Sequence, residues 1–228
     1  MAPAVATEPL TRSVEDYLKA IYRLSRGAQP ASTSEIAEHL GLSAPSVSGM
    51  VRRLSEQGLL EHVPYRGVVL TEPGRRVALR MVRRHRVLEA YLVGFLGYSW
   101  DSVHEEAERL EHAVSDALIE RMAGALGHPR FDPHGDPIPS TDGSIDELAY
   151  TSLAELPTGA TAEIRRVDTS QPERLRFLEQ AGLKPGVRVT LRDRQPFRGP
   201  LTLRIGTTDQ VIGQELAEQI LCVSGDAK

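Results

Sequence analysis

The stretch STSEIAEHLGLSAPSVSGMVRRLSEQGLLEHVPYRGVVLT, residues 32–71, decides the fold of the N-terminal part of the chain. Its first part predicts a short helix capped by Ser34, followed by a turn at Gly41. Ser43 can cap a second helix that runs to about Gln57. Two short helices around a glycine-containing turn are typical of a helix-turn-helix.

The segments on either side of these two helices complete the motif. Two β-prone runs, 59–63 and 68–71, are joined by a Pro/Gly tip and predict a hairpin. Upstream, apolar residues at helical spacing predict a helix that starts at Ser13, where Ser13 and Asp16 resemble a capping box. Helix, helix, turn, helix and hairpin is the order of a winged helix-turn-helix.

The rest of the chain predicts a helical middle and a β-rich end. A long helix is expected over 72–96, and a second helical region over 101–125 with a break near Ser115. Four prolines within 127–143 predict an irregular linker. Beyond it, short β-prone runs with Gly/Pro turns predict a small β-barrel. Its clearest elements are the strands 162–164, 187–191 and 201–205 and the helical pieces 172–180 and 214–218.

Composition excludes several classes of protein. The chain has 228 residues, 40% of them apolar and 25% charged, as in ordinary globular domains. Its one cysteine, Cys222, excludes an internal disulfide and a Cys-rich zinc site. No run approaches the roughly 18 apolar residues of a membrane span, and residues 1–10 lack the basic start of a signal peptide. We therefore expect a cytoplasmic protein with no membrane partner.

Charge is distributed unevenly along the chain. Residues 1–84 hold 12 Lys and Arg against 8 Asp and Glu, whereas residues 85–150 hold 4 against 13. A basic N-terminal part suits nucleic acid, and an acidic middle suits cations. Chance clustering on hydrated faces is the alternative.

The predicted second helix of the helix-turn-helix has the composition of a DNA-reading helix. Its outward side chains are small, so its first turns can approach base edges closely, and later arginines can meet phosphates. The candidate DNA contacts are Ser32, Thr33, Ser34, Ser43, Ala44, Pro45, Ser46, Ser48, Gly49, Arg52, Arg53 and Arg66. The alternative is that the serines only cap helices and the arginines are solvated. Few long base-reading side chains are present, which favours indirect readout.

The acidic middle contains side chains of the kinds that bind metals. His85 and Glu89 are spaced i,i+4 on the long helix. On the next helix, His104, Glu108, Glu111 and His112 form one polar stripe beside the apolar face. Burying these groups under a neighbouring helix is costly unless a divalent cation neutralises the carboxylates. A hydrated face, or a core histidine with its own partner, is the alternative.

Several motifs together resemble the diphtheria-toxin-repressor family of iron- and manganese-dependent bacterial transcription regulators. They are residues 14–18, the SAPSVS stretch 43–48, Arg84-His85-Arg86, the run from His104 to His112, and 136–139 (DPIP). The resemblance implies a winged helix-turn-helix over 1–74, a helical metal-binding and dimerisation domain over 75–143, and an SH3-like β-barrel over 144–228. It also implies a homodimer that binds a double-stranded DNA operator, most simply a repressor of metal-uptake genes, and not an enzyme.

The same resemblance implies two metal sites. The primary site would use Asp16, Glu108, Glu111 and His112. The ancillary site would use His85, Glu89, His104, Asp168 and Gln171. Iron-sensing members have Met and Cys where this chain has Asp16 and Glu108, so oxygen and imidazole ligands favour Mn²⁺, with Fe²⁺ as the alternative. Asp132 and Asp136 stand where iron-sensing relatives hold an anion with Arg86, and we expect no anion site here.

Two other functions are compatible with parts of the sequence. One is a winged-helix regulator that senses a small organic ligand, with the acidic stripe merely solvated. The other is a metal-dependent hydrolase, but no His-Glu-x-x-His motif or nucleophile elbow is present.

Overall fold

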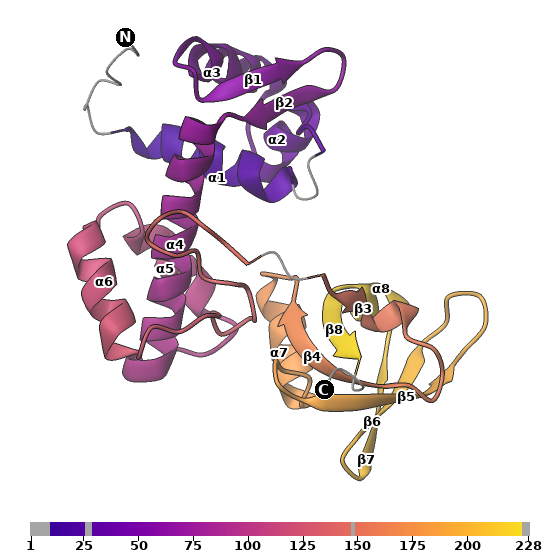
Figure 1. The fold of residues 1–228 in the computed structure, drawn as a ribbon. Coiled ribbons are helices and arrows are strands. Elements are labelled where there is room, and N and C mark those ends of the chain that lie inside the picture. Colours follow the sequence, from indigo (N-terminus) through magenta and orange to yellow (C-terminus); the bar gives the residue numbers. More distant parts are fainter. Residues whose placement is uncertain (1–9, 26–28, 147–148, 225–228) are drawn as a thin grey trace. The chain divides into compact units, whose positions relative to one another are not determined.

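The computed structural model describes residues 10–25, 29–146 and 149–224, and it has the predicted mainly α fold with a small β part (Figure 1). The chain divides into two compact units. The first holds Met1–Arg83 and Pro139–Ser144, and the second holds Arg84–Ile138 and Ile145–Lys228. The predicted domain boundaries, at 74/75 and 143/144, stay predictions. Residues 1–9, most of the segment considered for a signal peptide, lie outside the described residues.

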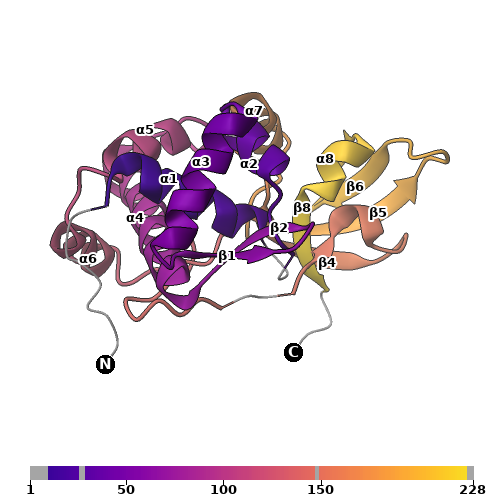
Figure 2. The same cartoon turned by 90° about the horizontal axis from the view of Figure 1, so that it is seen from above.

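The first unit contains the predicted winged helix-turn-helix. Its elements are α1 (Arg12–Leu24), α2 (Thr33–Leu40), α3 (Ala44–Glu56), β1 (Leu60–Val63), β2 (Gly67–Leu70) and the first part of α4 (Glu72–Leu96). Gly41 ends α2 in the left-handed region, with φ of 64°, which glycine adopts without steric cost. Figure 2 shows the three short helices together with the antiparallel β1–β2 hairpin. The order of elements predicted from the sequence is confirmed.

Two predicted helix starts are wrong. Ser32, not Ser34, caps α2: its hydroxyl accepts from the Glu35 N–H at 3.2 Å, and the Glu35 carboxylate accepts from the Ser32 N–H at 2.8 Å. This reciprocal pair is a capping box, which needs the acid three residues after the cap and so selects Ser32. Helix α1 follows Thr11, so Ser13 lies inside its first turn and is not its cap. The predicted Ser43 cap of α3 is confirmed.

The helical part of the second unit surrounds a small apolar core. The rest of α4 packs with α5 (Val103–Leu110) and α6 (Asp116–Ala125), and the fully buried core side chains are Val87, Leu88, Ala107, Ile119 and Ala123. Ser115 caps α6 by accepting from the Leu118 N–H, which confirms the predicted break. Residues 127–143 form the predicted irregular linker, with one isolated bridge between Phe131 and Pro137.

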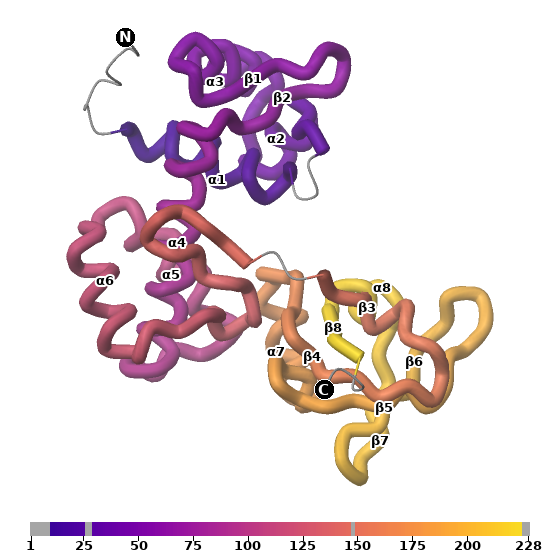
Figure 3. Tube along the Cα trace, viewed as in Figure 1, coloured from indigo at the N-terminus to yellow at the C-terminus, as the bar shows by residue number. Residues whose placement is uncertain are grey.

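The β part of the second unit is an antiparallel sheet whose strand order is β3-β8-β4-β5-β6-β7. Its elements are β3 (Thr151–Ser152), the short η1 (Leu153–Glu155), β4 (Thr161–Val167), α7 (Pro172–Gln180), β5 (Arg188–Arg194), β6 (Leu201–Ile205), β7 (Thr208–Ile212), α8 (Gln214–Glu218) and β8 (Ile220–Ser224). Figure 3 traces them in chain order. Alternate side chains, such as Ala162 and Ile164, enter a large apolar core. Fully burying a large aliphatic side chain such as that of Ile164 stabilises the fold by about 1.5–3 kcal/mol. Trp100, from the turn before α5, also belongs to this core.

No helix in the described ranges is both long enough and apolar enough to cross a membrane.

Candidate metal centre and DNA-binding surface

Helices α4 and α5 bring three metal-ligand side chains together inside the second unit. His85 and Glu89 lie one turn apart on α4 and are 7% and 2% exposed. His85 Nε2 and His104 Nδ1 each lie 3.0 Å from Glu89 Oε1 and 3.0 Å from each other. Two imidazole nitrogens and a carboxylate oxygen therefore converge on one point. We call His85, Glu89 and His104 the ancillary triad.

Glu111 fixes the orientation of His85 in this triad. It is fully buried, and its Oε2 lies 2.6 Å from His85 Nδ1. When Nδ1 donates its proton to that carboxylate, a neutral His85 presents the lone pair of Nε2 to Glu89 and His104. A lone pair facing a carboxylate oxygen is repulsive, and a cation removes that repulsion. A carboxylate behind a ligating histidine is also the usual outer partner at metal sites. The donor set thus fits a divalent ion.

Glu108 stands beside the same cluster. Its carboxylate lies 3.7 Å from His104 Nε2, and the donor atoms of His85, His104 and Glu108 fall within 4.8 Å of one another. His112 lies next to Glu111, with Nε2 at 3.5 Å from Glu111 Oε1. The polar stripe predicted on one helix therefore continues into the turn after α5, which ends at Leu110.

A second donor group comes from the linker. Glu89, Asp132 and His134 have donor atoms within 4.8 Å of one another, and His134 Nδ1 lies 3.7 Å from Glu89 Oε2. The other ring nitrogen, Nε2, donates to the Trp100 carbonyl at 2.9 Å, which leaves Nδ1 facing the carboxylates. Our sequence interpretation missed Asp132 and His134 as candidate ligands. The signal available was two acids and a histidine within five linker residues, Asp132-Pro-His-Gly-Asp136.

The pKa values of the buried groups in this region depend on both burial and the neighbouring charges. Burial raises the pKa of Glu89, but His85, His104 and His134 together hold it well below its usual value. Burial, reinforced by the carboxylates of Asp136 and Glu89, raises the pKa of Asp132 to about 7. Burial lowers the pKa of His134, yet Glu89 and Asp132 overcome that effect and raise it to about 9. Glu89 is therefore an anion in a site already rich in imidazole.

Arg86 is paired with carboxylates. Its guanidinium lies 2.9 Å from Asp136 Oδ1 and 3.7 Å from Asp132 Oδ2. Asp132 and Asp136 are the two residues at which the resemblance places an anion in iron-sensing relatives. The expectation that no anion site forms here stays a prediction.

In the first unit, the predicted DNA-contacting residues lie on an accessible surface. Ala44, Pro45, Ser46, Ser48 and Gly49 are all exposed on α3. The other exposed candidates are Ser34, Ser43, Arg52, Arg53 and Arg66. Ser32 and Thr33 are partly buried. A Cβ added at Gly49 would meet nothing within 4 Å, so this face of α3 is open. The Ser48 hydroxyl donates to the Ala44 carbonyl, and Arg52 pairs with Glu56 at 3.0 Å.

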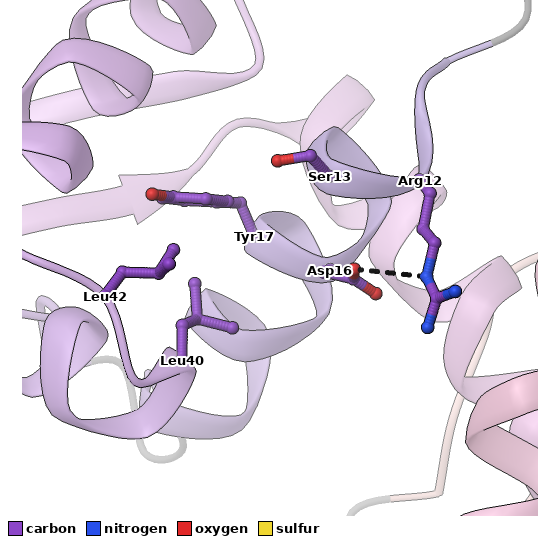
Figure 4. Close-up of a pocket in the computed structure, with 6 residues that line it drawn as sticks. All are labelled: Arg12, Ser13, Asp16, Tyr17, Leu40 and Leu42. Atoms are coloured by element: carbon purple, nitrogen blue, oxygen red, sulfur yellow. Dashed lines mark ion pairs between the residues drawn. The ribbon is translucent and has the colours of Figure 1, made fainter.

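Asp16 lies on α1 at the edge of a pocket of about 450 Å³ in the first unit (Figure 4). The Arg12 guanidinium is 3.8 Å from the Asp16 carboxylate. Tyr17, Leu40 and Leu42 form the apolar part of the lining. Asp16 belongs to the first unit and Glu108, Glu111 and His112 belong to the second, so the predicted primary site that combines them stays a prediction.

Comparison with known proteins shows that three segments of the chain match three known domain families. Residues 9–68 match the iron dependent repressor N-terminal DNA binding domain, 71–140 match its metal binding and dimerisation domain, and 151–224 match the FeoA domain. The iron-dependent repressor IdeR of Mycobacterium tuberculosis is 32% identical over 92% of this chain and 96% of its own length. The chain belongs to the iron-dependent repressor family.

The wider family resemblance predicted from the motifs is thereby confirmed. The diphtheria toxin repressor of Corynebacterium diphtheriae is 30% identical over 92% of this chain and 96% of its own length. A solved manganese-dependent transcriptional repressor in complex with manganese is 41% identical, with a TM-score of 0.86, over 92% of this chain and 99% of that one. The manganese regulator SloR is 35% identical, with a TM-score of 0.76, over 94% and 100%. As a member of this family, the chain is a metal-dependent transcriptional repressor and not an enzyme, as predicted.

Two more residues predicted for the ancillary site, Asp168 and Gln171, come from the SH3-like part of the chain. Asp168 Oδ1 accepts from Arg166 at 2.7 Å, and its side chain is 49% exposed. Gln171 is the N-cap residue of α7. Within the described part of the chain, Asp168 joins no group of three or more His, Cys, Asp or Glu side chains with donor atoms that close together. Their assignment as ligands stays a prediction.

Proposed function

We propose that this repressor is a cytoplasmic homodimer, activated by Mn²⁺ with Fe²⁺ as the alternative, that represses metal-uptake genes. The observation that carries the proposal is the convergence of His85 Nε2, His104 Nδ1 and Glu89 Oε1 at 3.0 Å. The donors are nitrogen and oxygen, without sulfur, and this set suits Mn²⁺ better than metals that favour thiolates. The manganese-dependent repressors among the structural relatives support the same choice.

His85, Glu89 and His104 would hold one ion, with Glu108 and the linker residues Asp132 and His134 as neighbouring donors. Asp16, Glu108, Glu111 and His112 would hold a second ion at the primary site. A bound divalent ion supplies positive charge that offsets the repulsion among these carboxylates. Asp16 would thereby tie helix α1 of the DNA-binding domain to the helical domain.

Two protomers are needed to read an operator. Phe95 and Leu96 at the end of α4 and Leu118 on α6 are 55%, 60% and 42% exposed, which supports association through the helical domain. The recognition helices α3 of a dimer would enter successive major grooves about 34 Å apart. If the metal binds the DNA-competent arrangement about 100-fold better than the other, it supplies about 2.7 kcal/mol of bias.

A promoter-binding titration with and without Mn²⁺ tests this function. We expect Asp16→Ala and Glu108→Ala to lose Mn²⁺-dependent binding, whereas Glu105→Ala, an exposed acid on the same helix, should retain it. Arg52→Ala should weaken binding to all DNA sequences and reduce the salt slope by about one. Equal DNA binding by the wild type after complete chelation would contradict the proposal.

The organic-ligand alternative makes a different prediction. In that case equilibrium dialysis would detect no Mn²⁺ uptake by the wild type, and the carboxylates around His85 would be only part of the protein's internal polar network.

A further inference from the structure

Trp100, the only tryptophan of the chain, belongs at once to the metal region and to the SH3-like core. It is 5% exposed and lies in the apolar cluster of the barrel. Its ring stacks on His134, with centroids 5.4 Å apart and planes at 24°. Its carbonyl accepts from His134 Nε2 at 2.9 Å, and its own Nε1 donates to the Pro133 carbonyl at 3.0 Å. The position of His134 is therefore set by a residue that the barrel encloses.

The linker segment 132–136, which we call the His134 loop, is folded tightly against strand β4. Asp132 Oδ1 accepts from the N–H groups of His134 and Asp136, at 2.8 and 2.9 Å. The His134 carbonyl accepts from the Val167 N–H at 2.9 Å. A Cβ added at Gly135 would lie 1.9 Å from the Arg165 carbonyl oxygen, and φ there is 87°. Only glycine permits this approach of the loop to the strand.

A buried charge chain joins the same loop to both domains. Asp136 Oδ1 lies 2.9 Å from Arg86 of α4 and 3.0 Å from Arg166 of β4. Arg166 also donates to Asp168 at 2.7 Å. Arg86 and Arg166 are 7% and 9% exposed, and Arg86 directly follows His85 in the sequence. One carboxylate thus ties the barrel to the helix that carries the metal triad.

We propose that Arg166 and Trp100 are positioning residues that link docking of the SH3-like domain to metal binding at His85, Glu89, His104 and His134. This inference rests on the proposed metal-binding function. Linkage is reciprocal, so an ion that needs the ordered His134 loop also strengthens the docking of the barrel. Loss of outer partners of metal ligands typically weakens metal affinity by about 10- to 100-fold.

The first test is Mn²⁺ affinity, measured by equilibrium dialysis on full-length protein. Arg166→Met removes the charge but keeps most of the side-chain volume, and we expect about 10-fold weaker binding at one site. Arg176→Met is the matched control, because Arg176 pairs at 2.9 Å with Asp101, a residue outside the His134 loop, and this pair joins the same two domains. It should change affinity less than about 2-fold, and Arg166→Lys should restore part of the loss. Circular dichroism checks that each variant is folded.

The second test uses the fluorescence of Trp100, which only undocking of the barrel or opening of its core would expose. Acrylamide quenching is measured with and without Zn²⁺, a closed-shell ion chosen because Mn²⁺ can itself quench. Quenching should fall when the ion binds the wild type and should respond less in Arg166→Met. A second disruption, Gly135→Ala, should reproduce the Arg166→Met result through the backbone clash.

The outcomes separate the two proposals. A wild type that binds no Mn²⁺ overturns both of them. A wild type that binds Mn²⁺ while Arg166→Met binds it equally well, with unchanged Trp100 quenching, overturns the linkage alone. An equal loss of affinity in Arg176→Met would also overturn it, because the effect would then not pass through the His134 loop.

Discussion

The two parts of the second unit fill their interiors in opposite ways. The barrel encloses a large core of apolar side chains from five strands, two helices and η1. The helical part has a small core cluster of five buried apolar residues, and near it this part buries several ionisable groups, among them His85, Arg86, Glu89, Glu111, Asp132 and His134. An apolar core stabilises a fold without help, whereas buried carboxylates and imidazoles cost free energy unless paired or bound to an ion. We therefore expect the barrel to be stable without a bound ion, whereas the stability of the helical part should depend on the ion that it binds.

A cavity in the barrel core should change the free energy of unfolding more than any other test of this contrast. Leu203 on β6 is completely buried, so Leu203→Ala should lower the free energy of unfolding by about 2–5 kcal/mol. The loss should be the same with and without Mn²⁺, as measured by urea denaturation followed by circular dichroism. Val211→Ala, at a 57% exposed position on β7, is the control and should cost less than about 0.5 kcal/mol. A Leu203→Ala defect that Mn²⁺ repaired would remove the distinction between the two cores.

Metal removal should act on the helical part. At a free Mn²⁺ concentration about 100 times Kd, binding stabilises the folded state by about 2.7 kcal/mol. Hydrogen–deuterium exchange should therefore show greater protection of α4 and α5 with Mn²⁺ than with EDTA. Strands β6 and β7, which lie at the edge of the sheet away from β3, should change little. If Mn²⁺ increased protection in the barrel as much as in α4 and α5, the two parts would unfold as one unit. That result would contradict the contrast between them.

The contrast between the parts also explains what the sequence could reveal. The winged helix-turn-helix, the long α4 and the barrel follow from periodicity, caps and turn residues, because each is determined locally. The ancillary triad was predictable in composition: His85 and Glu89 share a helix face, and the family motif adds His104 and Glu111. The i,i+4 spacing predicts that His85 and Glu89 lie side by side on α4. That His104 of α5 joins them depends on the packing of α5 against α4.

The remainder of the site depends on tertiary contacts that no local pattern encodes. Asp132 and His134 come from an irregular linker, where there is no period to indicate which side chains point inward. Their placement depends on Trp100 and on β4, more than 30 residues away in either direction. The start of α2 was mispredicted for a simpler reason, since Ser32, Thr33 and Ser34 are all acceptable caps and only Glu35 distinguishes them.

A smaller effect comes from proton binding in the metal-free protein. The raised pKa of His134, about 9, means that its contribution to stability is fully present below its unfolded value of about 6.5 and is lost as pH rises through 9. The raised pKa of Asp132, about 7, likewise removes stability between its unfolded value of about 3.9 and pH 7. The lowered pKa of Glu89 acts in the opposite sense, and its stabilisation is lost only as the solution becomes strongly acidic.

The EDTA-treated protein should accordingly lose stability from pH 6 to 9, on the order of 1 kcal/mol for each titrating group. Melting temperatures measured across this range check the sign. His134→Gln should flatten the part above pH 7, and Asp132→Asn the part below it. Stability that rises from pH 7 to 9 in the metal-free wild type would contradict this account.

The smallest effect concerns Cys222, which reports on the barrel alone. Burial raises the pKa of its thiol to about 12, so almost no thiolate is present near pH 8, and the sulfur is also fully shielded from solvent. Because the thiolate is the reactive form, iodoacetamide at pH 8 should leave the native protein unmodified and alkylate it fully in urea, as read by mass spectrometry. Chelation of metal should leave this protection intact, because the barrel core needs no ion, whereas Leu203→Ala should accelerate labelling by making the core open more often. Labelling that began as soon as EDTA was added would show that the apolar core, too, depends on the metal, and the barrel would then not be the independent half of the molecule.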